Sequence, residues 1–137
     1  MSAAASRSIL PGDWTRARGF SHAVLAQGTR LLTIAGQIAL PKGAGQVNPA
    51  HDFVQQWAIA LGNVVELVRE AGGQPEHIVV LRAFVTDIEE YHAAMPRLGD
   101  SWRANMGRHF PAMTLVQVAA LDDPHAKVEI EGQAFLP

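Results

Sequence analysis

Apolar residues recur at helical spacing in the stretch that follows Asn48-Pro49. Intervals of three or four residues place them on one face of a helix. The stripe consists of Phe53, Trp57, Leu61, Val64 and Val68. Asn48 is a candidate N-cap with a proline at the first helical position, and Gly72-Gly73 supplies a left-handed stop. The pattern therefore predicts a helix from about residue 49 to residue 71.

A second helical stripe begins after Asp87, which forms a capping-box pattern with Glu90. Gly107 ends this segment. Pro96 lies inside it and is expected to kink the helix or to split off its first turn. The stripe consists of Tyr91, Met95, Leu98, Trp102 and Met106.

Other segments have the composition and period of strands. Residues 23–26 and 31–35 predict a β-hairpin with its turn at 27–30, and residues 114–119 and 127–135 predict two further strands. Residues 78–85 predict a central strand that is apolar on both faces. One of its faces carries Val79, Leu81, Ala83 and Val85, and the other carries Ile78, Val80, Arg82 and Phe84.

The order of these elements predicts one α+β domain over residues 1–137, with two helices packed on one face of a mixed sheet. Residues 1–19 show no clear periodicity, and we expect about residues 1–8 to be disordered. Two helices leave the other face of the sheet uncovered, where Val80 and Phe84 would each cost roughly 1.5–3 kcal/mol to leave wet. Self-association is the simplest cover for such a face, so we expect a homo-oligomer.

Composition narrows the classes of partner and compartment. The chain has a net charge of −2 and no lysine-rich run, which makes nucleic acid an unlikely partner. Its six histidines are too scattered to form a local metal pair, it has no cysteine, and no nucleotide-binding fingerprint is present, so we expect no metal and no cofactor. No segment resembles a signal peptide or a membrane span, so we expect a cytoplasmic protein with no membrane partner.

One segment carries a specific motif. It runs Pro111-Ala112-Met113-Thr114-Leu115-Val116-Gln117-Val118 to Leu121, followed by Val128-Glu129-Ile130-Glu131. It resembles the signature of the Rid/YjgF family of reactive-intermediate deaminases, older members of which are often called endoribonucleases. That signature is Pro-Ala-Arg-x-x-Val-x-Val-x-x-Leu and then Val/Ile-Glu-Ile-Glu. Four further segments match the family in the same order: 33–38, 61–64, 71–73 and 83–87.

The resemblance implies a chorismate-mutase-like α+β fold, a homotrimer, and ligand clefts between subunits. Family members hydrolyse enamines and imines to keto acids and ammonia. In them the motif arginine binds the substrate carboxylate, and a glutamate of the last strand positions or activates water. Glu129 matches that glutamate, and His22 falls near a position that is often tyrosine, so we expect both to be catalytic. The residues expected to bind substrate are Met113, Leu115, Ala35, Gly36 and Gln117.

Met113 stands where the family has its arginine. Methionine has neither a charge nor N–H donors, and a charge-assisted hydrogen bond is worth roughly 1.5–3 kcal/mol. Arg82 and Arg108 are candidates to replace it, and a surface role is the plainer reading of each. Three functions stay open: a hydrolase for an imine or enamine other than the usual one, a non-catalytic trimer that binds a small metabolite, and, less favoured, an endoribonuclease.

Overall fold

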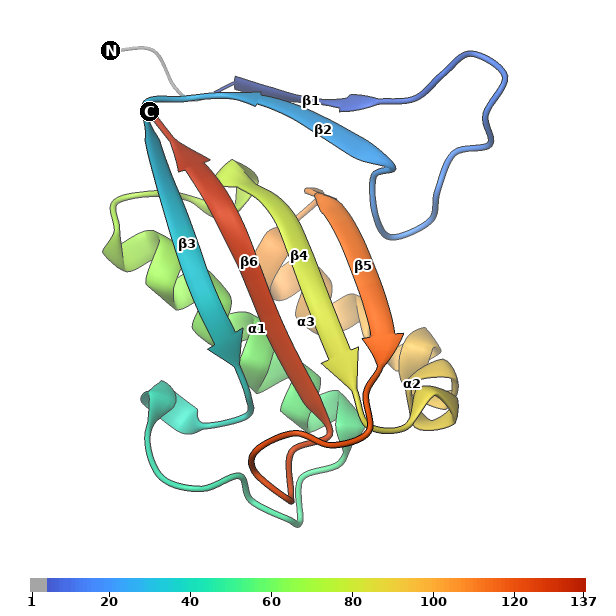
Figure 1. Ribbon diagram of the computed structural model, residues 1–137, viewed down its shortest axis with the longest axis vertical. Coiled ribbons are helices and arrows are strands. Elements are labelled where there is room, and N and C mark those ends of the chain that lie inside the picture. Colours follow the sequence, from blue (N-terminus) through green and yellow to red (C-terminus); the bar gives the residue numbers. More distant parts are fainter. Residues whose placement is uncertain (1–4) are drawn as a thin grey trace.

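The computed structural model describes residues 5–137, which form a four-stranded mixed sheet with three helices on one face and a separate two-stranded sheet (Figure 1). The strands are β1 (Ala5–Ile9), β2 (Ala23–Gln27), β3 (Arg30–Gln37), β4 (Ile78–Val85), β5 (Ala112–Gln117) and β6 (Val128–Leu136). The helices are α1 (Phe53–Glu70), α2 (Ile88–Ala94) and α3 (Gly99–Met106), with short 3-10 turns η1 (Pro41–Gly43), η2 (Pro75–His77) and η3 (Met95–Arg97). The predicted α+β class is confirmed.

The larger sheet has the order β3-β6-β4-β5, in which only β4 and β5 run parallel. β6 lies between β3 and β4 and alternates strictly between buried and half-buried residues. Its buried side packs on α1, and its other side, with Glu129 and Glu131, faces away from the helices. The uncovered face expected from the sequence is therefore present.

The predicted hairpin of residues 23–26 and 31–35 is wrong. β2 pairs with β1, whereas β3 pairs with β6, so the two strands belong to different sheets. The connection lacks an Asn-Gly or Asp-Gly pair of the kind that closes a tight hairpin. Instead it bends against the last strand, where the Thr29 N–H donates to the Leu136 carbonyl at 2.9 Å. Residues 1–4 of the segment expected to be disordered lie outside the described residues, but residues 5–9 form β1.

The first helix has the predicted stripe on its buried face, but it begins four residues later than the sequence suggests. Asp52 is the N-cap: its side chain accepts from the Gln55 N–H at 2.9 Å, and the Gln55 side-chain oxygen accepts from the Asp52 N–H at 2.8 Å. Asn48 instead closes a short turn by accepting from the Ala50 N–H. The predicted stop is confirmed, because Gly72 has a φ of 90° and follows Ala71, the C-cap of the helix.

The second predicted helix is two helices, so the sheet carries three rather than two. Asp87 caps α2 by accepting from the N–H groups of Glu89 and Glu90. Pro96 then occupies the first turn of η3, which separates α2 from α3. A proline there has no N–H to continue the α2 hydrogen bonds, and its fixed φ suits the start of a new turn.

A β-bulge at the start of β4 changes the face of the sheet to which its first side chain points. The register with β6 slips between Ile78 and Val80, which turns Ile78 to the helix side with Leu81, Ala83 and Val85. Ile78 is fully buried there, so its predicted place on the other face is wrong. Val80, Arg82 and Phe84 are half-buried on the face without helices, as predicted.

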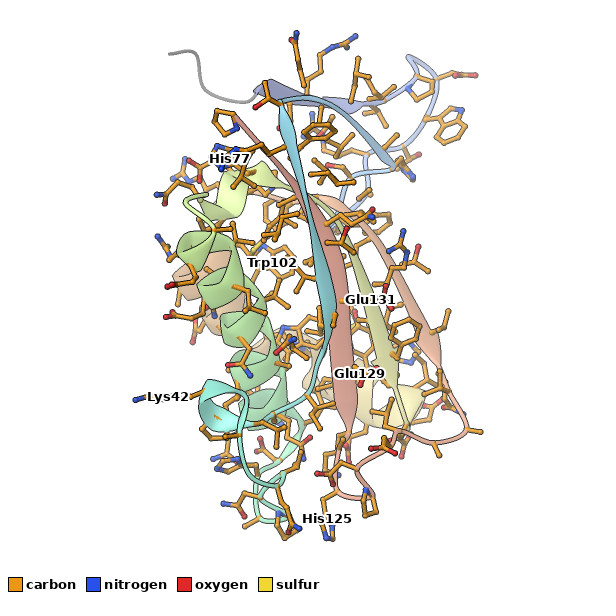
Figure 2. The ribbon with its side chains drawn as sticks, turned by 60° about the vertical axis from the view of Figure 1, so that its left-hand side comes forward. Lys42, His77, Trp102, His125, Glu129 and Glu131 are labelled. Carbon is orange, nitrogen blue, oxygen red and sulfur yellow. The ribbon has the colours of Figure 1, made fainter. Side chains whose placement is uncertain are left out.

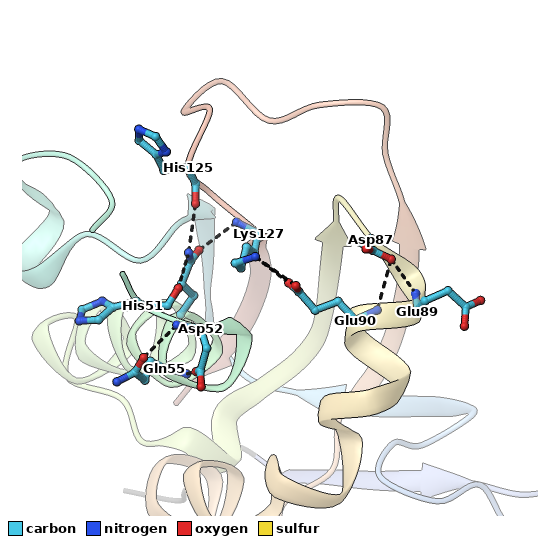
Figure 3. A network of polar contacts seen from close by, with 9 residues as sticks. His51, Asp52, Gln55, Asp87, Glu89, Glu90, His125 and Lys127 are labelled. Carbon is cyan, nitrogen blue, oxygen red and sulfur yellow. Dashed lines mark hydrogen bonds and ion pairs between the residues drawn. The ribbon is translucent and has the colours of Figure 1, made fainter. Parts of the chain in front are cut away.

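Polar contacts fix the loop before β6 to the helices (Figure 3). The Gln56 side chain is fully buried, donates to the His125 carbonyl at 3.0 Å and accepts from the Lys127 N–H at 2.9 Å. The Lys127 ammonium also pairs with Glu90 of α2 at 3.0 Å. Glu90 thus binds Lys127 rather than completing the predicted capping box.

Candidate functional site

A cavity of about 670 Å³ opens beside the β5 edge of the sheet, between β5, α2, α3 and the loop before β2. Most of its lining is apolar. The lining residues are Arg18, Gly19, Phe20, Trp57, Tyr91, His92, Met95, Leu98, Gly99, Trp102, Arg103, Phe110, Met113 and Leu115. A concave, mostly apolar site with a few polar groups is the usual form of a small-molecule site.

Met113 and Leu115 enter this cavity from β5. The parallel register places Met113 beside Leu81 and Leu115 beside Ala83, both of which are buried under the helices. Side chains two residues apart on a strand share a face, so Met113 and Leu115 both point to the helix side. Two of the residues expected to bind substrate are therefore together.

Aromatic rings form much of the cavity wall. The rings of Trp102 and Phe110 stack with centroids 5.7 Å apart and planes 5° from parallel. Trp57 is 2% exposed, and its indole N–H has no hydrogen-bond acceptor within the described residues. Burial raises the pKa of the Tyr91 hydroxyl above its usual range, so this group is neutral at physiological pH.

Glu129 lies on the opposite face of the sheet from Met113. It pairs in register with Phe84 and alternates with the buried residues Val128 and Ile130. Figure 2 shows Glu129 and Glu131 on the side of the sheet away from α1, with Trp102 between helices and sheet. Within a single chain the glutamate and the apolar cavity do not meet.

Gly36 and Ala35, both in β3, lie with Glu129 rather than with Met113. A Cβ atom built on Gly36 would come 2.7 Å from the Glu129 carboxyl carbon, so the glutamate side chain lies directly over this glycine. Ala35 precedes it and is exposed. The β3–β6 register is irregular between Ile34 and Gln37, which is where this close approach occurs. Five of the expected site residues thus fall into two groups, one on each face of the sheet: Met113 and Leu115 on one, and Glu129, Gly36 and Ala35 on the other.

His22 belongs to neither group. It lines a second cavity, of about 470 Å³, and its Nε2 lies 3.1 Å from the Thr15 carbonyl oxygen. Its ring meets Trp14 and Phe20 edge to face. Phe20, two residues earlier, lines both this cavity and the cavity with Met113. Gln117 lies at the end of β5, where its side-chain oxygen accepts from the Ile88 N–H and caps α2.

The structure brings neither candidate arginine to Met113. Arg82 pairs with Glu131 at 3.4 Å on the face without helices, and Arg108 lines the second cavity with His22. Arg18, which the sequence analysis did not single out, lines the same cavity as Met113. No sequence pattern marks Arg18 as different from its neighbour Arg16, because both lie in a loop without periodicity.

Residues 5–137 contain neither a cluster of metal-ligating side chains nor a membrane-spanning helix. No three histidine, aspartate or glutamate side chains in this part of the chain converge as metal ligands would. Across the same residues, each helix is too short or too polar to traverse a bilayer.

Comparison with known proteins gives a consistent result. The family model described as Endoribonuclease L-PSP matches residues 14–136. A goat 2-iminobutanoate/2-iminopropanoate deaminase is 31% identical over 115 residues, covering 84% of this chain and 78% of that protein. A RutC family protein of Haemophilus influenzae is 33% identical over 91 residues, covering 66% of this chain and 68% of its own.

Solved structures agree with the sequence relatives. A Rid family protein from Yersinia pestis, YyfB, has a TM-score of 0.79 at 32% identity and covers 96% of this chain and 98% of its own. The YjgF protein of E. coli has a TM-score of 0.67 at 27% identity. The match covers 94% of this chain and 98% of the YjgF chain. With a family model that spans most of its length and relatives above 30% identity, this chain is a member of the Rid/YjgF family.

Proposed function

We propose that the protein hydrolyses an imine or enamine that is more apolar than the usual amino-acid-derived substrate, in a cleft between subunits. The observation that carries this proposal is the Glu129 carboxylate. It lies over Gly36, and it makes no ion pair or hydrogen bond within residues 5–137. A carboxylate without a partner is available to bind water and to accept a proton from it.

The proposed reaction needs only water as co-reactant. Glu129 accepts a proton from water as the water oxygen attacks the C=N carbon, and the nitrogen takes up a proton. In the resulting carbinolamine, the nitrogen takes the proton that Glu129 had accepted. The hydroxyl group loses its proton to solvent as the remaining C–N bond breaks, which releases ammonia and leaves a carbonyl group. The neutral walls formed by Met113 and Leu115 favour an apolar substrate body over a small anion.

The proposal requires the protein to self-associate. Glu129 and the cavity lie on opposite faces of one sheet, so a complete site requires the open face of one copy to meet the cavity of another. We propose the homotrimer of the family as that assembly, working in the cytoplasm. The apolar part of the open face, including Phe84 and the 58%-exposed Leu31, supplies surface to bury.

The test measures ammonia release from a panel of imines generated in situ. Glutamine has nearly the same size and shape as glutamate but no carboxylate to accept a proton. We therefore expect Glu129→Gln to lower turnover at least about a hundredfold, in the range typical of a general base. Glu131→Gln is the matched control, because Glu131 lies on the same strand and face but is paired with Arg82. Equal losses in the two variants, or no turnover of any imine by the unmodified protein, would count against the proposal.

A second candidate is a non-catalytic trimer that binds a small metabolite. The uncharged Met113 favours it, because the family's carboxylate-binding arginine is absent. Thermal stabilisation by a ligand that is recovered chemically unchanged, together with no ammonia release, would support this candidate. An endoribonuclease stays less favoured, because the chain has a net charge of −2 and no lysine-rich run.

A further inference from the structure

The cavity that holds Met113 is lined by five aromatic residues: Phe20, Trp57, Tyr91, Trp102 and Phe110. Phe20 and Phe110 are 37% and 40% exposed, so parts of their surfaces are open to a ligand. Aromatic rings attract one another in edge-to-face and offset-stacked arrangements beyond the effect of buried area. The cavity walls are therefore suited to a planar ring.

Arg18 supplies a positive charge to the same cavity. It is exposed and has no ion-pair partner among residues 5–137, whereas Arg103, the other arginine of the lining, is already paired with Asp100 at 2.5 Å. The lining contains no aspartate or glutamate. A guanidinium group matches a carboxylate with two parallel N–H donors. An anionic ligand group could therefore pair with the free guanidinium group of Arg18, and no carboxylate in the cavity lining would repel it.

The wall also holds an unsatisfied donor. The Trp57 indole N–H is buried without an acceptor, and buried donors of this kind are rare in native proteins. A carbonyl oxygen or imine nitrogen in the ligand is a chemically suitable acceptor. The aromatic lining and the charge of Arg18 are evidence for a ligand that is independent of the Trp57 N–H.

We propose that the cavity binds a ligand made of an aromatic ring and a carboxylate, with the ring near Phe110 and Trp102 and the carboxylate on Arg18. Arg18, from the loop before β2, thereby takes over the anion binding that Met113 cannot provide. The inference rests on the proposed function only for the location of the site. Under that function, the substrate is the imine or enamine of an aromatic amino acid and the product is an aromatic 2-keto acid.

The experiment measures binding by calorimetry with three probes: phenylpyruvate, pyruvate, which lacks the ring, and phenylacetone, which lacks the carboxylate. We expect phenylpyruvate to bind at least about tenfold more tightly than either of the others, since each lacks one of the two contacts. Arg18→Ala should weaken phenylpyruvate roughly fivefold to tenfold and leave phenylacetone unchanged. Phe110→Ala, at an exposed ring, should weaken both aromatic probes and not pyruvate.

Arg16→Ala is the matched control, because Arg16 lies on the same loop but lines the cavity of His22. The inference is overturned if Arg16→Ala and Arg18→Ala have equal effects or if pyruvate binds as tightly as phenylpyruvate. It is also overturned if no probe binds, as would happen if side chains of a second copy fill the cavity. Tight binding of phenylpyruvate without ammonia release from the corresponding imine would instead reject the proposed hydrolysis and retain the ligand.

Discussion

At the scale of single residues, Met113 separates this chain from the family signature. Its side chain reaches the cavity from β5, beside Leu115 and across from the aromatic wall. It leaves space for an apolar ligand and offers no hydrogen-bond donor. Under the proposed function, methionine in place of arginine would therefore alter which ligand the cavity favours, although β5 pairs with β4 along its whole length.

Met113→Arg is expected to restore binding of small 2-keto acids. An arginine at this position would offer a bidentate partner for a carboxylate, worth roughly 1.5–3 kcal/mol, or about ten- to a hundredfold in affinity. Pyruvate affinity measured by calorimetry checks this outcome. Leu115→Met, a change of similar size and no charge in the same cavity, should leave pyruvate binding as it was. If the two variants bind pyruvate equally, the cavity does not present position 113 to a carboxylate.

At the scale of elements, α2 depends on a short cap because it has only seven residues. Asp87→Ala removes the acceptor for two N–H groups of its first turn, and loss of such a cap costs about 1 kcal/mol. Urea unfolding should show this loss with an unchanged m-value. Asp122→Ala, which changes an aspartate in the loop between β5 and β6, is the comparison and should cost less. A loss below the error of the measurement for Asp87→Ala would mean that Gln117, which also caps α2, is sufficient.

The helices and strands also show how much of the fold could be predicted from the sequence. The stripe of α1 and the alternation of β6 depend on local periodicity, and both were predicted correctly. The partner of β2 is β1, whose five residues carry no alternating pattern, so the pairing could not be found from neighbouring sequence. The Ile78 bulge depends on register with β6, which periodicity within one strand does not contain.

The candidate site shows the same limit. The family motif identified Met113 and Glu129 as site residues. The alternation along each strand shows which of its other residues point to the same face as Met113 or Glu129. Only the order and register of the sheet reveal that those faces are opposite. Arg18 and Phe20 were not identified, because their loop meets β5 through long-range contacts such as the Ser21 N–H to the Pro111 carbonyl at 3.0 Å.

At the scale of the whole molecule, the separation of Glu129 from the cavity makes the proposed site a property of the assembly. If each cleft takes Glu129 from one copy and the cavity from another, then two inactive variants should complement each other. Glu129→Gln removes the proposed base, and Met113→Glu places a negative charge in the cavity, where it should repel an anionic substrate. Each variant alone is expected to be inactive in ammonia release.

Trimers reassembled from an equal mixture of these two variants should regain about a quarter of the activity of the unmodified protein. In a closed ring, an active cleft needs its cavity from the Glu129→Gln copy and its glutamate from the Met113→Glu copy, and each condition is met about half of the time. Circular dichroism of each variant and size-exclusion chromatography of the mixture establish that the copies are folded and associated. If associated mixtures recover no activity, then cavity and glutamate do not act together across the interface, because a site that used both from one chain would be damaged in every copy.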